Sequence, residues 1–412
     1  MTGRLKTDGR LKAMLVAHYR DAFLARRRRR PVAWVTSGAP VELLHALGIL
    51  PVYPENFAAV AASRHLAVEL CEAAEAAGYS PDLCSYARTS IGSMLTGQGP
   101  LKGKALPEPD LLFAASNICG VVVKWWEVVA RHYRVPLFIL DFPFVSERLT
   151  AHQVDYVRRQ LEEAIAFLQA QTGRQLTRGA LAARLRLSAE AVALWNQVQL
   201  CRRAAPCPVG ALDAFTNLFP MVTLRGTRAC VDYLRRLCRE VEGRVARGEG
   251  AVQGERYRLI WDNIAIWHAF GLIRYLHSRG ASFVGETYTW AWGEYEFGPE
   301  DLHDPLGSLA TQYSQVILNI DLGRRLERLL HMVKGQRADG VLFHSCRSCK
   351  TYSLGQLPLA REIGNRLAVP SLLLEADMAD ARAYSEGQAR TRVDAFLEVL
   401  DSRRNGSCRA SG

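Results

Sequence analysis

The sequence of 412 residues lacks a long uninterrupted apolar run, and its first residues are polar. A membrane-spanning helix needs about 20 apolar residues in succession and a secretion signal needs a shorter apolar core, so we expect a cytoplasmic protein that enters no membrane. A glycine-rich phosphate loop of the Walker or dinucleotide type is also missing, which indicates that any ATP hydrolysis takes place on another protein. Ten cysteines without a secretion signal are typical of reduced thiols, metal ligands or catalytic groups rather than of a disulfide framework.

Acidic residues are in the minority, because 41 Asp and Glu face 52 Lys and Arg and give a formal net charge of +11. Part of the excess is an arginine run at 26–30, which follows a predicted helix over 11–25 and precedes Pro31. The helix macrodipole favours cations at a C-terminus, so we interpret the run as a solvated helix end. The sequence has neither zinc-finger spacing nor an interleaved aromatic and basic signature, so no nucleic-acid partner is expected. Basic surface can instead attract a polyanionic small molecule.

Short apolar runs alternate with helical patterns in both halves of the chain. The runs occupy 32–36, 48–53, 111–115 and 135–140 in the first half and 257–261, 282–285, 340–343 and 369–374 in the second. This alternation predicts an α/β fold with two similar lobes, each with a mainly parallel sheet flanked by helices. Among the helical patterns, 58–78 and 309–335 each predict one helix.

The stretch between the two lobes has long helical patterns and little strand character, so it predicts a helical middle domain. The expected organisation is an N-terminal helical arm (1–30), lobe one (31–145), the middle domain (146–255) and lobe two (256–412).

Three cysteines stand just after apolar runs or in the turns that follow them. Cys119 follows the run at 111–116, Cys349 follows the run at 341–345, and Cys84 lies in a turn of lobe one. Because the carboxyl ends of parallel strands gather in one crevice, these thiols can hold one iron–sulfur cluster and leave one coordination position open for substrate. An isolated cysteine is usually a small core residue, and we keep that interpretation for six others. They are Cys71, Cys201, Cys207, Cys230, Cys238 and Cys408.

Cys346 lies three residues before Cys349 and leaves two other kinds of site open. The Cys-x-x-Cys spacing can form a thiol–disulfide pair, although such motifs belong to smaller units and would leave Cys84 and Cys119 unexplained. A structural zinc site is a weaker alternative, because zinc prefers four closed ligands and the sequence has no second Cys-x-x-Cys.

Longer motifs resemble the 2-hydroxyacyl-CoA dehydratase and benzoyl-CoA reductase family. They lie at 36–42, 51–56, 84–88, 261–263, 285–288, 349–356, 372–378 and 384–392. The resemblance implies a 4Fe-4S cluster held by Cys84, Cys119 and Cys349. Cys349 is preferred because the residues after it align with the family motif, while Cys346 competes for the same role. The resemblance further implies a heterodimer with a related sister subunit, or pairing with a second copy, and an ATP-hydrolysing iron–sulfur activator protein.

The implied reaction is radical chemistry on an acyl-CoA thioester. An added electron turns the thioester carbonyl into a ketyl radical anion that expels an adjacent hydroxyl, so a 2-hydroxyacyl-CoA dehydratase, a lyase, is expected. Ring reduction of the benzoyl-CoA reductase type, an oxidoreductase reaction, and a non-catalytic electron-relay or scaffold subunit are the alternatives. The acyl group stays open.

Two further residues are expected beside the open iron. Ser37 follows the first strand and can cap that iron or bind the substrate, or it can be the N-cap of a helix that begins at Pro40. Glu55 follows the second strand and can move a proton to the departing hydroxyl or to a ring carbon, or it can be an exposed turn carboxylate.

Overall fold

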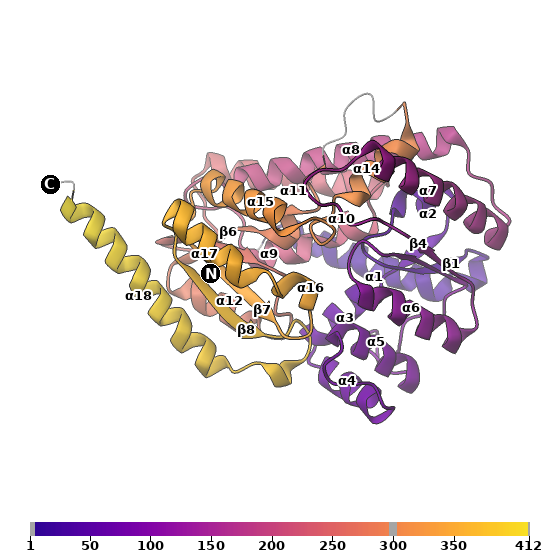
Figure 1. Ribbon diagram of the computed structural model, residues 1–412, viewed down its shortest axis with the longest axis horizontal. Coiled ribbons are helices and arrows are strands. Elements are labelled where there is room, and N and C mark those ends of the chain that lie inside the picture. Colours follow the sequence, from indigo (N-terminus) through magenta and orange to yellow (C-terminus); the bar gives the residue numbers. More distant parts are fainter. Residues whose placement is uncertain (1–4, 296–302, 411–412) are drawn as a thin grey trace.

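The computed structural model describes residues 5–295 and 303–410, with side chains to residue 404, and contains two four-stranded parallel sheets (Figure 1). The first sheet has the order β2-β1-β3-β4 and consists of β1 (Val32–Val35), β2 (Leu50–Val52), β3 (Leu111–Ala115) and β4 (Leu137–Leu140). The second has the order β6-β5-β7-β8 and consists of β5 (Tyr257–Asp262), β6 (Ala281–Glu286), β7 (Gly340–Cys346) and β8 (Ser371–Ala376). The shared strand order confirms the predicted α/β class with two similar lobes.

The central strands are buried along their whole length, because helices cover both faces of each sheet. Every residue of β1, β3 and β5 is buried, whereas β4 and β8, at the sheet edges, are partly accessible. Continuous apolar runs are typical of parallel strands covered on both faces. Local sequence was therefore enough to find all eight strands.

The helices follow the strands in the expected alternation. The N-terminal arm contains α1 (Asp8–Leu24), and lobe one contains α2 (Val41–Ala46), α3 (Pro54–Ser63), α4 (Ala67–Ala76), α5 (Ser85–Thr96) and α6 (Gly120–Tyr133). Between the sheets lie α7 (Ala151–Thr172), α8 (Arg178–Cys201), α9 (Ala211–Asn217), α10 (Phe219–Thr223) and α11 (Arg228–Ala246). Lobe two contains α12 (Phe270–Ser278), α13 (Thr287–Trp290), α14 (Pro305–Ser314), α15 (Leu322–Gly335), α16 (Lys350–Ser353), α17 (Gln356–Leu367) and α18 (Glu386–Ala410). Short 3-10 turns form η1 (Arg26–Arg28) and η3 (Ala381–Ala383).

Two helices expected to be continuous are broken. The pattern over 58–78 is divided between α3 and α4 by a turn in which His65 has a φ of 59°, a left-handed conformation that ends the first helix. The pattern over 309–335 is divided between α14 and α15, and Asp321 caps α15 by accepting the N–H of Arg324 at 2.9 Å. Apolar periodicity continues across both breaks, so it could not reveal them.

The helices between the sheets are anchored to both lobes through buried ion pairs. Arg202, at the end of α8, donates to Glu286 of β6 at 2.7 Å, and neither side chain is exposed. Arg225, after α10, donates to Glu42 of α2 at 3.0 Å, and the hydroxyl of Tyr313 donates to the same carboxylate at 2.7 Å. Figure 1 shows α8 and α11 along one side of the molecule, across both lobes. The domain boundaries themselves stay a prediction.

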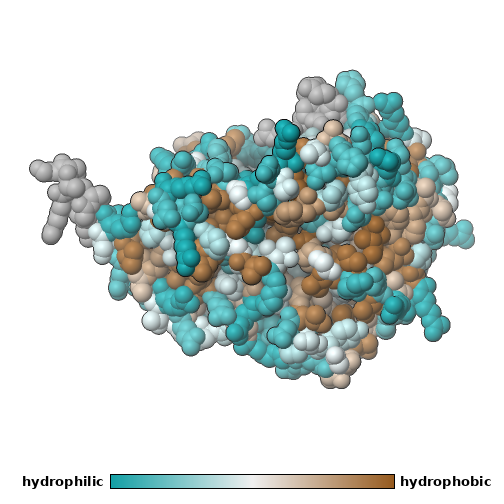
Figure 2. Space-filling view, viewed as in Figure 1, coloured by the Kyte–Doolittle hydropathy of each residue, from teal (hydrophilic) through white to brown (hydrophobic). Residues whose placement is uncertain are grey.

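Figure 2 shows charged and polar residues over the viewed face, with apolar patches between them. Among the helices described, none combines the length and the hydrophobicity that a bilayer crossing requires.

Candidate functional site

Two of the three cysteine-bearing loops, those of Cys119 and Cys349, leave the carboxyl ends of corresponding strands in the two lobes. In parallel sheets of this strand order, the ligand crevice lies between the first and third strands of the lobe. This is the topological switch point, where the strand order reverses. In lobe one the loops after β1 and β3 carry Ser37 and Cys119, and in lobe two the loop after β7 carries Cys349. Both sets of loops contribute to one hydrophobic cluster that also includes Cys84 and Trp267. The site therefore lies where the two crevices meet.

Each of the three predicted thiols immediately precedes a helix. Cys84 is the N-cap residue of α5, Cys119 that of α6 and Cys349 that of α16, and all three are partly buried. The N-terminus of a helix carries partial positive charge, which favours a thiolate over a thiol. This repeated placement gives three sulfur donors electrostatic support from separate elements.

The three thiols also interact with one another. Burial raises the pKa of Cys84 well above its usual value, and the neighbouring Cys349 and Cys119 raise it further. Burial likewise raises the pKa of Cys349 to about 12, with a further contribution from Cys119. All three pairs are therefore close enough to repel when ionised. Without a compensating positive centre, the thiols stay protonated at neutral pH.

Cys346 faces a different neighbour. It ends β7, is 1% exposed, and its thiol donates to Asp377 Oδ2 at 3.8 Å. Burial raises the pKa of Cys346 well above its usual value, and Asp377 and then Cys349 add to the rise. Cys346 thus packs in the same hydrophobic cluster as the other three thiols but is hydrogen-bonded to Asp377, whereas Cys349 interacts with both Cys84 and Cys119.

The donor set fits an iron–sulfur cluster better than a single metal ion. Among residues 5–295 and 303–410, no three His, Cys, Asp or Glu side chains are close enough to hold one ion. In a cubane each iron binds its own cysteine, so the ligands of a cluster are spaced more widely than those of one ion. Thiolates are the ligands that iron–sulfur clusters select, and the surrounding apolar residues provide an environment of low polarity.

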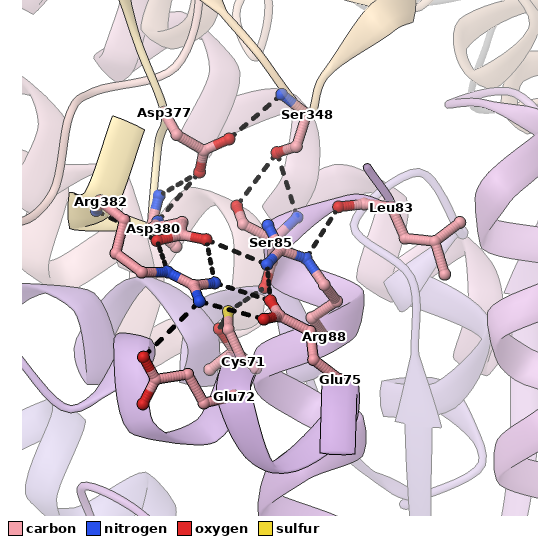
Figure 3. Close-up of polar contacts among 12 residues, drawn as sticks. Cys71, Glu72, Glu75, Leu83, Ser85, Arg88, Ser348, Asp377, Asp380 and Arg382 are labelled. Carbon is pink, nitrogen blue, oxygen red and sulfur yellow. Dashed lines mark hydrogen bonds and ion pairs between the residues drawn. The ribbon is translucent and has the colours of Figure 1, made fainter. Parts of the chain in front are cut away.

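Two of the cysteine loops bind each other directly across the lobes (Figure 3). The backbone N–H of Ser85, next to Cys84, donates to Ser348 Oγ at 3.1 Å, and the two serine hydroxyls are 3.2 Å apart. The N–H of Ser348 donates in turn to Asp377 at 3.1 Å. These bonds set the position of Cys84 relative to the Cys349 loop.

A charge network around the buried Arg88 side chain reinforces this contact, and we call it the inter-lobe latch (Glu75, Arg88, Asp380 and Arg382; Figure 3). Arg88 of α5, whose side chain is 3% exposed, donates to Asp380 Oδ2 at 2.9 Å and also pairs with Glu75 of α4. Arg382 of η3 binds both carboxylates, at 2.7 Å and 2.6 Å. Burial opposes ionisation of Asp380, but hydrogen bonds from Arg382 and Arg88 outweigh it and lower its pKa to about 2. The latch thus stays charged at neutral pH.

Polar residues of lobe two stabilise the Cys346–Cys349 turn through hydrogen bonds. Ser353 Oγ accepts the N–H of Cys346 at 2.9 Å and donates to its carbonyl at 3.1 Å. Gln356 donates to Asp262 Oδ2 at 2.7 Å, and the hydroxyl of Thr287 donates to Oδ1 of the same carboxylate at 2.9 Å. These residues come from three of the sequence motifs that carried the family resemblance, and the fold brings them into one buried network.

Ser37 and Glu55 lie together in lobe one. The N–H and hydroxyl of Ser37 donate to the two carboxylate oxygens of Glu55, at 2.7 Å and 2.8 Å. The N-cap alternative for Ser37 is wrong, because α2 begins at Val41 with Pro40 as its N-cap residue. The alternative of an exposed turn for Glu55 is also wrong, because Glu55 is partly buried in the first turn of α3. Burial raises the pKa of Glu55 to about 7, although the hydrogen bonds from Ser37 oppose the rise.

The loop that carries Ser37 is fixed against the loop of Cys119. Thr36 Oγ1 accepts the N–H of Ala115 at 3.0 Å, and the Asn117 amide donates to the carbonyl of Gly38 at 2.9 Å. A Cβ atom at Gly38 would lie 2.1 Å from Asn117 Oδ1, so this close approach requires glycine. The contacts place Ser37 on the same side of the sheet as Cys119.

Tyr288 lies in the site, although no role was predicted for it from the sequence. Burial raises its pKa, and Glu55 and Cys349 raise it further, so Tyr288 lies near both the carboxylate of lobe one and the thiol of lobe two. It packs against the hydrophobic clusters of both lobes. The sequence feature that could have identified Tyr288 as a site residue is its position directly after β6, within the motif at 285–288.

The remaining cysteines are distributed through the interior. Cys71, Cys207, Cys230 and Cys238 are buried and Cys201 is partly buried, while the side chain of Cys408 lies outside the described residues.

Comparisons with known proteins agree with this architecture. Residues 36–400 match the family described as 2-hydroxyglutaryl-CoA dehydratase, D-component. The chain is 34% identical over 397 residues to the (R)-2-hydroxyisocaproyl-CoA dehydratase alpha subunit of Clostridioides difficile, covering 95% of both chains. It is 29% identical over 382 residues to the (R)-phenyllactyl-CoA dehydratase alpha subunit of Clostridium sporogenes, covering 92% of both. It is also 31% identical over 382 residues to one subunit of the benzoyl-CoA reductase of Thauera aromatica, covering 90% of this chain and 88% of the relative. The matched segment includes every strand except β1 and every predicted site residue, and the chain therefore belongs to the family of the 2-hydroxyglutaryl-CoA dehydratase D-component.

Proposed function

We propose that this chain is the iron–sulfur subunit of a radical 2-hydroxyacyl-CoA dehydratase, with an acyl-CoA thioester as its substrate. The observation that carries the proposal is the meeting of Cys84, Cys119 and Cys349, each at a helix N-terminus, between the carboxyl ends of the two sheets. Relatives named as dehydratase alpha subunits, which align along nearly the whole chain, support the reaction class.

Cys84, Cys119 and Cys349 would hold a 4Fe-4S cluster and leave one iron without a protein thiolate. When bound, such a cluster supplies an electron of low potential and a Lewis-acidic iron. Burial raises the pKa of all three thiols, so they would be protonated before the cluster binds and would release their protons on binding it. Cys346 would stay protonated against Asp377 as a supporting residue of the loop.

Glu55 is the proposed proton donor of lobe one. Because burial raises its pKa to about 7, the carboxyl can hold a proton at neutral pH and release it to a hydroxyl that departs from the substrate. Ser37 donates two hydrogen bonds to this carboxylate and so fixes its orientation. Tyr288, which is buried near both Glu55 and Cys349, would exclude water from the space where the acyl group must lie.

The second candidate is ring reduction of an aromatic acyl-CoA, which the similarity to a benzoyl-CoA reductase favours. A proton from Glu55 would then go to a ring carbon instead of a departing hydroxyl. In either case we propose that the chain works in the cytoplasm with a related sister subunit, or a second copy, and receives electrons from an ATP-hydrolysing iron–sulfur activator protein. Relatives named as alpha subunits support the multi-subunit assembly.

The first experiment is anaerobic reconstitution with iron and sulfide, followed by metal analysis and EPR. We expect Cys84→Ser, Cys119→Ser and Cys349→Ser each to lose most of the cluster signal, while Cys346→Ser retains it. A cluster retained in Cys349→Ser and lost in Cys346→Ser would reverse the ligand assignment, and retention in all four variants would refute the site.

The second experiment is turnover with reduced activator and ATP, with 2-hydroxyacyl-CoA and aromatic acyl-CoA offered in parallel. An unsaturated acyl-CoA formed from the first substrate supports dehydration, whereas a reduced ring formed from the second supports the alternative. A cluster-loaded protein that neither binds nor converts these thioesters would identify an electron-relay subunit instead.

A further inference from the structure

Three arginines from separate segments meet at the edge of lobe one that is opposite the cysteines. Arg30 immediately precedes Pro31 and β1, Arg174 follows α7, and Arg184 lies on α8. We call this group the arginine cluster (Arg30, Arg174 and Arg184). The four residues of β1, at about 3.3 Å per residue, place about 13 Å of strand between Arg30 and the loop that carries Ser37. The cluster is therefore separate from the thiol site.

Backbone carbonyls hold the guanidinium groups in place. Arg30 Nε donates to the carbonyl of Gly48 at 3.1 Å, and Arg174 donates to the adjacent carbonyl of Leu47 at 2.8 Å. Arg184 donates to the carbonyl of Gly226 at 3.3 Å. Gly48 has a φ of 67°, and a Cβ atom there would lie 2.4 Å from a guanidinium nitrogen of Arg174. Each arginine thus uses one N–H on the backbone and keeps others for a ligand.

The charge of this cluster is poorly compensated. All three side chains are partly buried, and within the described part of the chain no carboxylate forms an ion pair with any of them. Asp21 raises the pKa of Arg30 through its charge, but its carboxylate forms an ion pair with Arg28, at 2.9 Å. Burial lowers the pKa of Arg30, and the charges of Arg174 and Arg184 lower it further. Like charges that are half-buried without a counter-ion repel each other, and a bound anion would remove that cost.

Two buried histidines line the same region without supplying a negative charge. Burial lowers the pKa of His45 to about 4, and the charges of Arg184 and Arg30 contribute to the decrease. Burial and then His45 and Arg30 lower the pKa of His18 to about 4. Both imidazoles are therefore neutral at pH 7, and the carboxylate of Glu42, which raises the pKa of His45, is itself paired with Arg225 at 3.0 Å.

We propose that the arginine cluster binds a phosphate group, either as free phosphate or as the phosphate ester of a nucleotide. A guanidinium presents a planar fork of N–H donors that matches the oxygens of phosphate, and backbone anchoring fixes these forks before the ligand arrives. Three neighbouring guanidinium groups suit a tetrahedral oxyanion, with its several oxygens, better than a single planar carboxylate. The proposal does not depend on the proposed redox function, because the site lies at the other edge of the sheet.

The test is isothermal titration of the full chain with inorganic phosphate, in an amine buffer at constant ionic strength. We expect the wild type to bind phosphate, and Arg174→Gln and Arg184→Gln each to bind it about tenfold more weakly, which is the effect of losing one charge-assisted hydrogen bond pair. Arg186→Gln is the matched control, because Arg186 is exposed on the same helix and carries the same charge. Circular dichroism of each variant checks that it is folded.

Coenzyme A and dephospho-coenzyme A, titrated in the same way, distinguish the two sources of phosphate. Binding of inorganic phosphate that depends on the arginine cluster identifies a free-anion site. Stronger binding of coenzyme A than of its dephospho form, with the same dependence, identifies a nucleotide phosphate. The proposal is overturned if no titrant binds, or if Arg186→Gln weakens binding as much as Arg174→Gln. An acidic segment of a partner protein would then be the remaining counter-ion.

Discussion

Replacement of Arg88 tests whether the inter-lobe latch holds the two halves of the thiol site together. The Arg88→Met side chain keeps most of the apolar stem but removes the guanidinium that joins Glu75 of α4 to Asp380 after β8. It also removes the hydrogen bond from Arg88 Nε to the carbonyl of Leu83, one residue before Cys84, which measures 3.0 Å. The substitution thus acts on the connection between the lobes and on the loop of one thiol.

The expected cost follows from burial. Breaking a buried ion pair by removal of one partner costs about 3–5 kcal/mol, because the other charge remains without compensation. Here Arg382 still binds both Asp380 and Glu75, so we expect the lower end, about 3 kcal/mol. Urea denaturation followed by tryptophan fluorescence measures this difference in the free energy of unfolding.

The pH dependence gives a second readout. Hydrogen bonds from Arg382 and Arg88 outweigh burial and lower the pKa of Asp380 to about 2, whereas an unfolded aspartate has a pKa of about 3.9. A carboxyl with a lowered pKa stabilises the fold above its unfolded pKa and loses that effect as the pH falls toward its folded pKa. The difference between wild type and Arg88→Met should therefore be complete above about pH 4 and shrink between about pH 4 and 2.

Arg366→Met is the matched control. Arg366 also pairs with two carboxylates, Glu327 at 2.8 Å and Glu362 at 3.0 Å, but its side chain is 49% exposed. Exposed pairs contribute about 1 kcal/mol or less, so this variant should lose little stability. Equal losses for Arg88→Met and Arg366→Met would refute the reasoning from burial.

Three further substitutions test the parts of the site. Glu55→Gln should change the pH dependence of unfolding, because burial raises the pKa of Glu55 to about 7. The wild type is therefore more stable at low pH and loses stability as the pH rises through 7. The loss is at most about 3 kcal/mol, because solvent screens the partly exposed carboxylate. Gln356→Leu should cost about 1–3 kcal/mol in urea denaturation, because buried Asp262 loses a donor at 2.7 Å. Gly38→Ala should cost about 1–3 kcal/mol in the same assay, because its Cβ would lie 2.1 Å from Asn117 Oδ1.

Controls for these variants come from exposed positions on the helices. Glu163→Gln and Gln171→Leu, both on the surface of α7, should each change stability by no more than about 0.5 kcal/mol. Gly179→Ala on α8 meets no atom within 4 Å and should be neutral or slightly stabilising. A site variant that behaves like its control would contradict the contact on which its prediction depends.

The sequence by itself determined the architecture and predicted where the candidate site lies. Strands buried on both faces must be apolar along their length, and helices between them show a longer period, so the two lobes could be predicted from local patterns. Cys119 and Cys349 stand after such strands, and the carboxyl ends of parallel strands share one crevice. Motif resemblance added Cys84, Ser37 and Glu55, and the comparisons confirmed the family.

Only the tertiary structure decided how the side chains are directed and which distant residues meet. Cys346 and Cys349 are three residues apart, at the end of β7 and in the turn that follows it. The path of that turn decides that Cys346 contacts Asp377 and that Cys349 lies near the lobe-one thiols. The bond between Ser37 and Glu55, the inter-lobe latch and the arginine cluster each join segments far apart in the chain. Periodicity reports only whether a residue faces the interior, whereas the identity of its neighbour is set by the packing of whole elements.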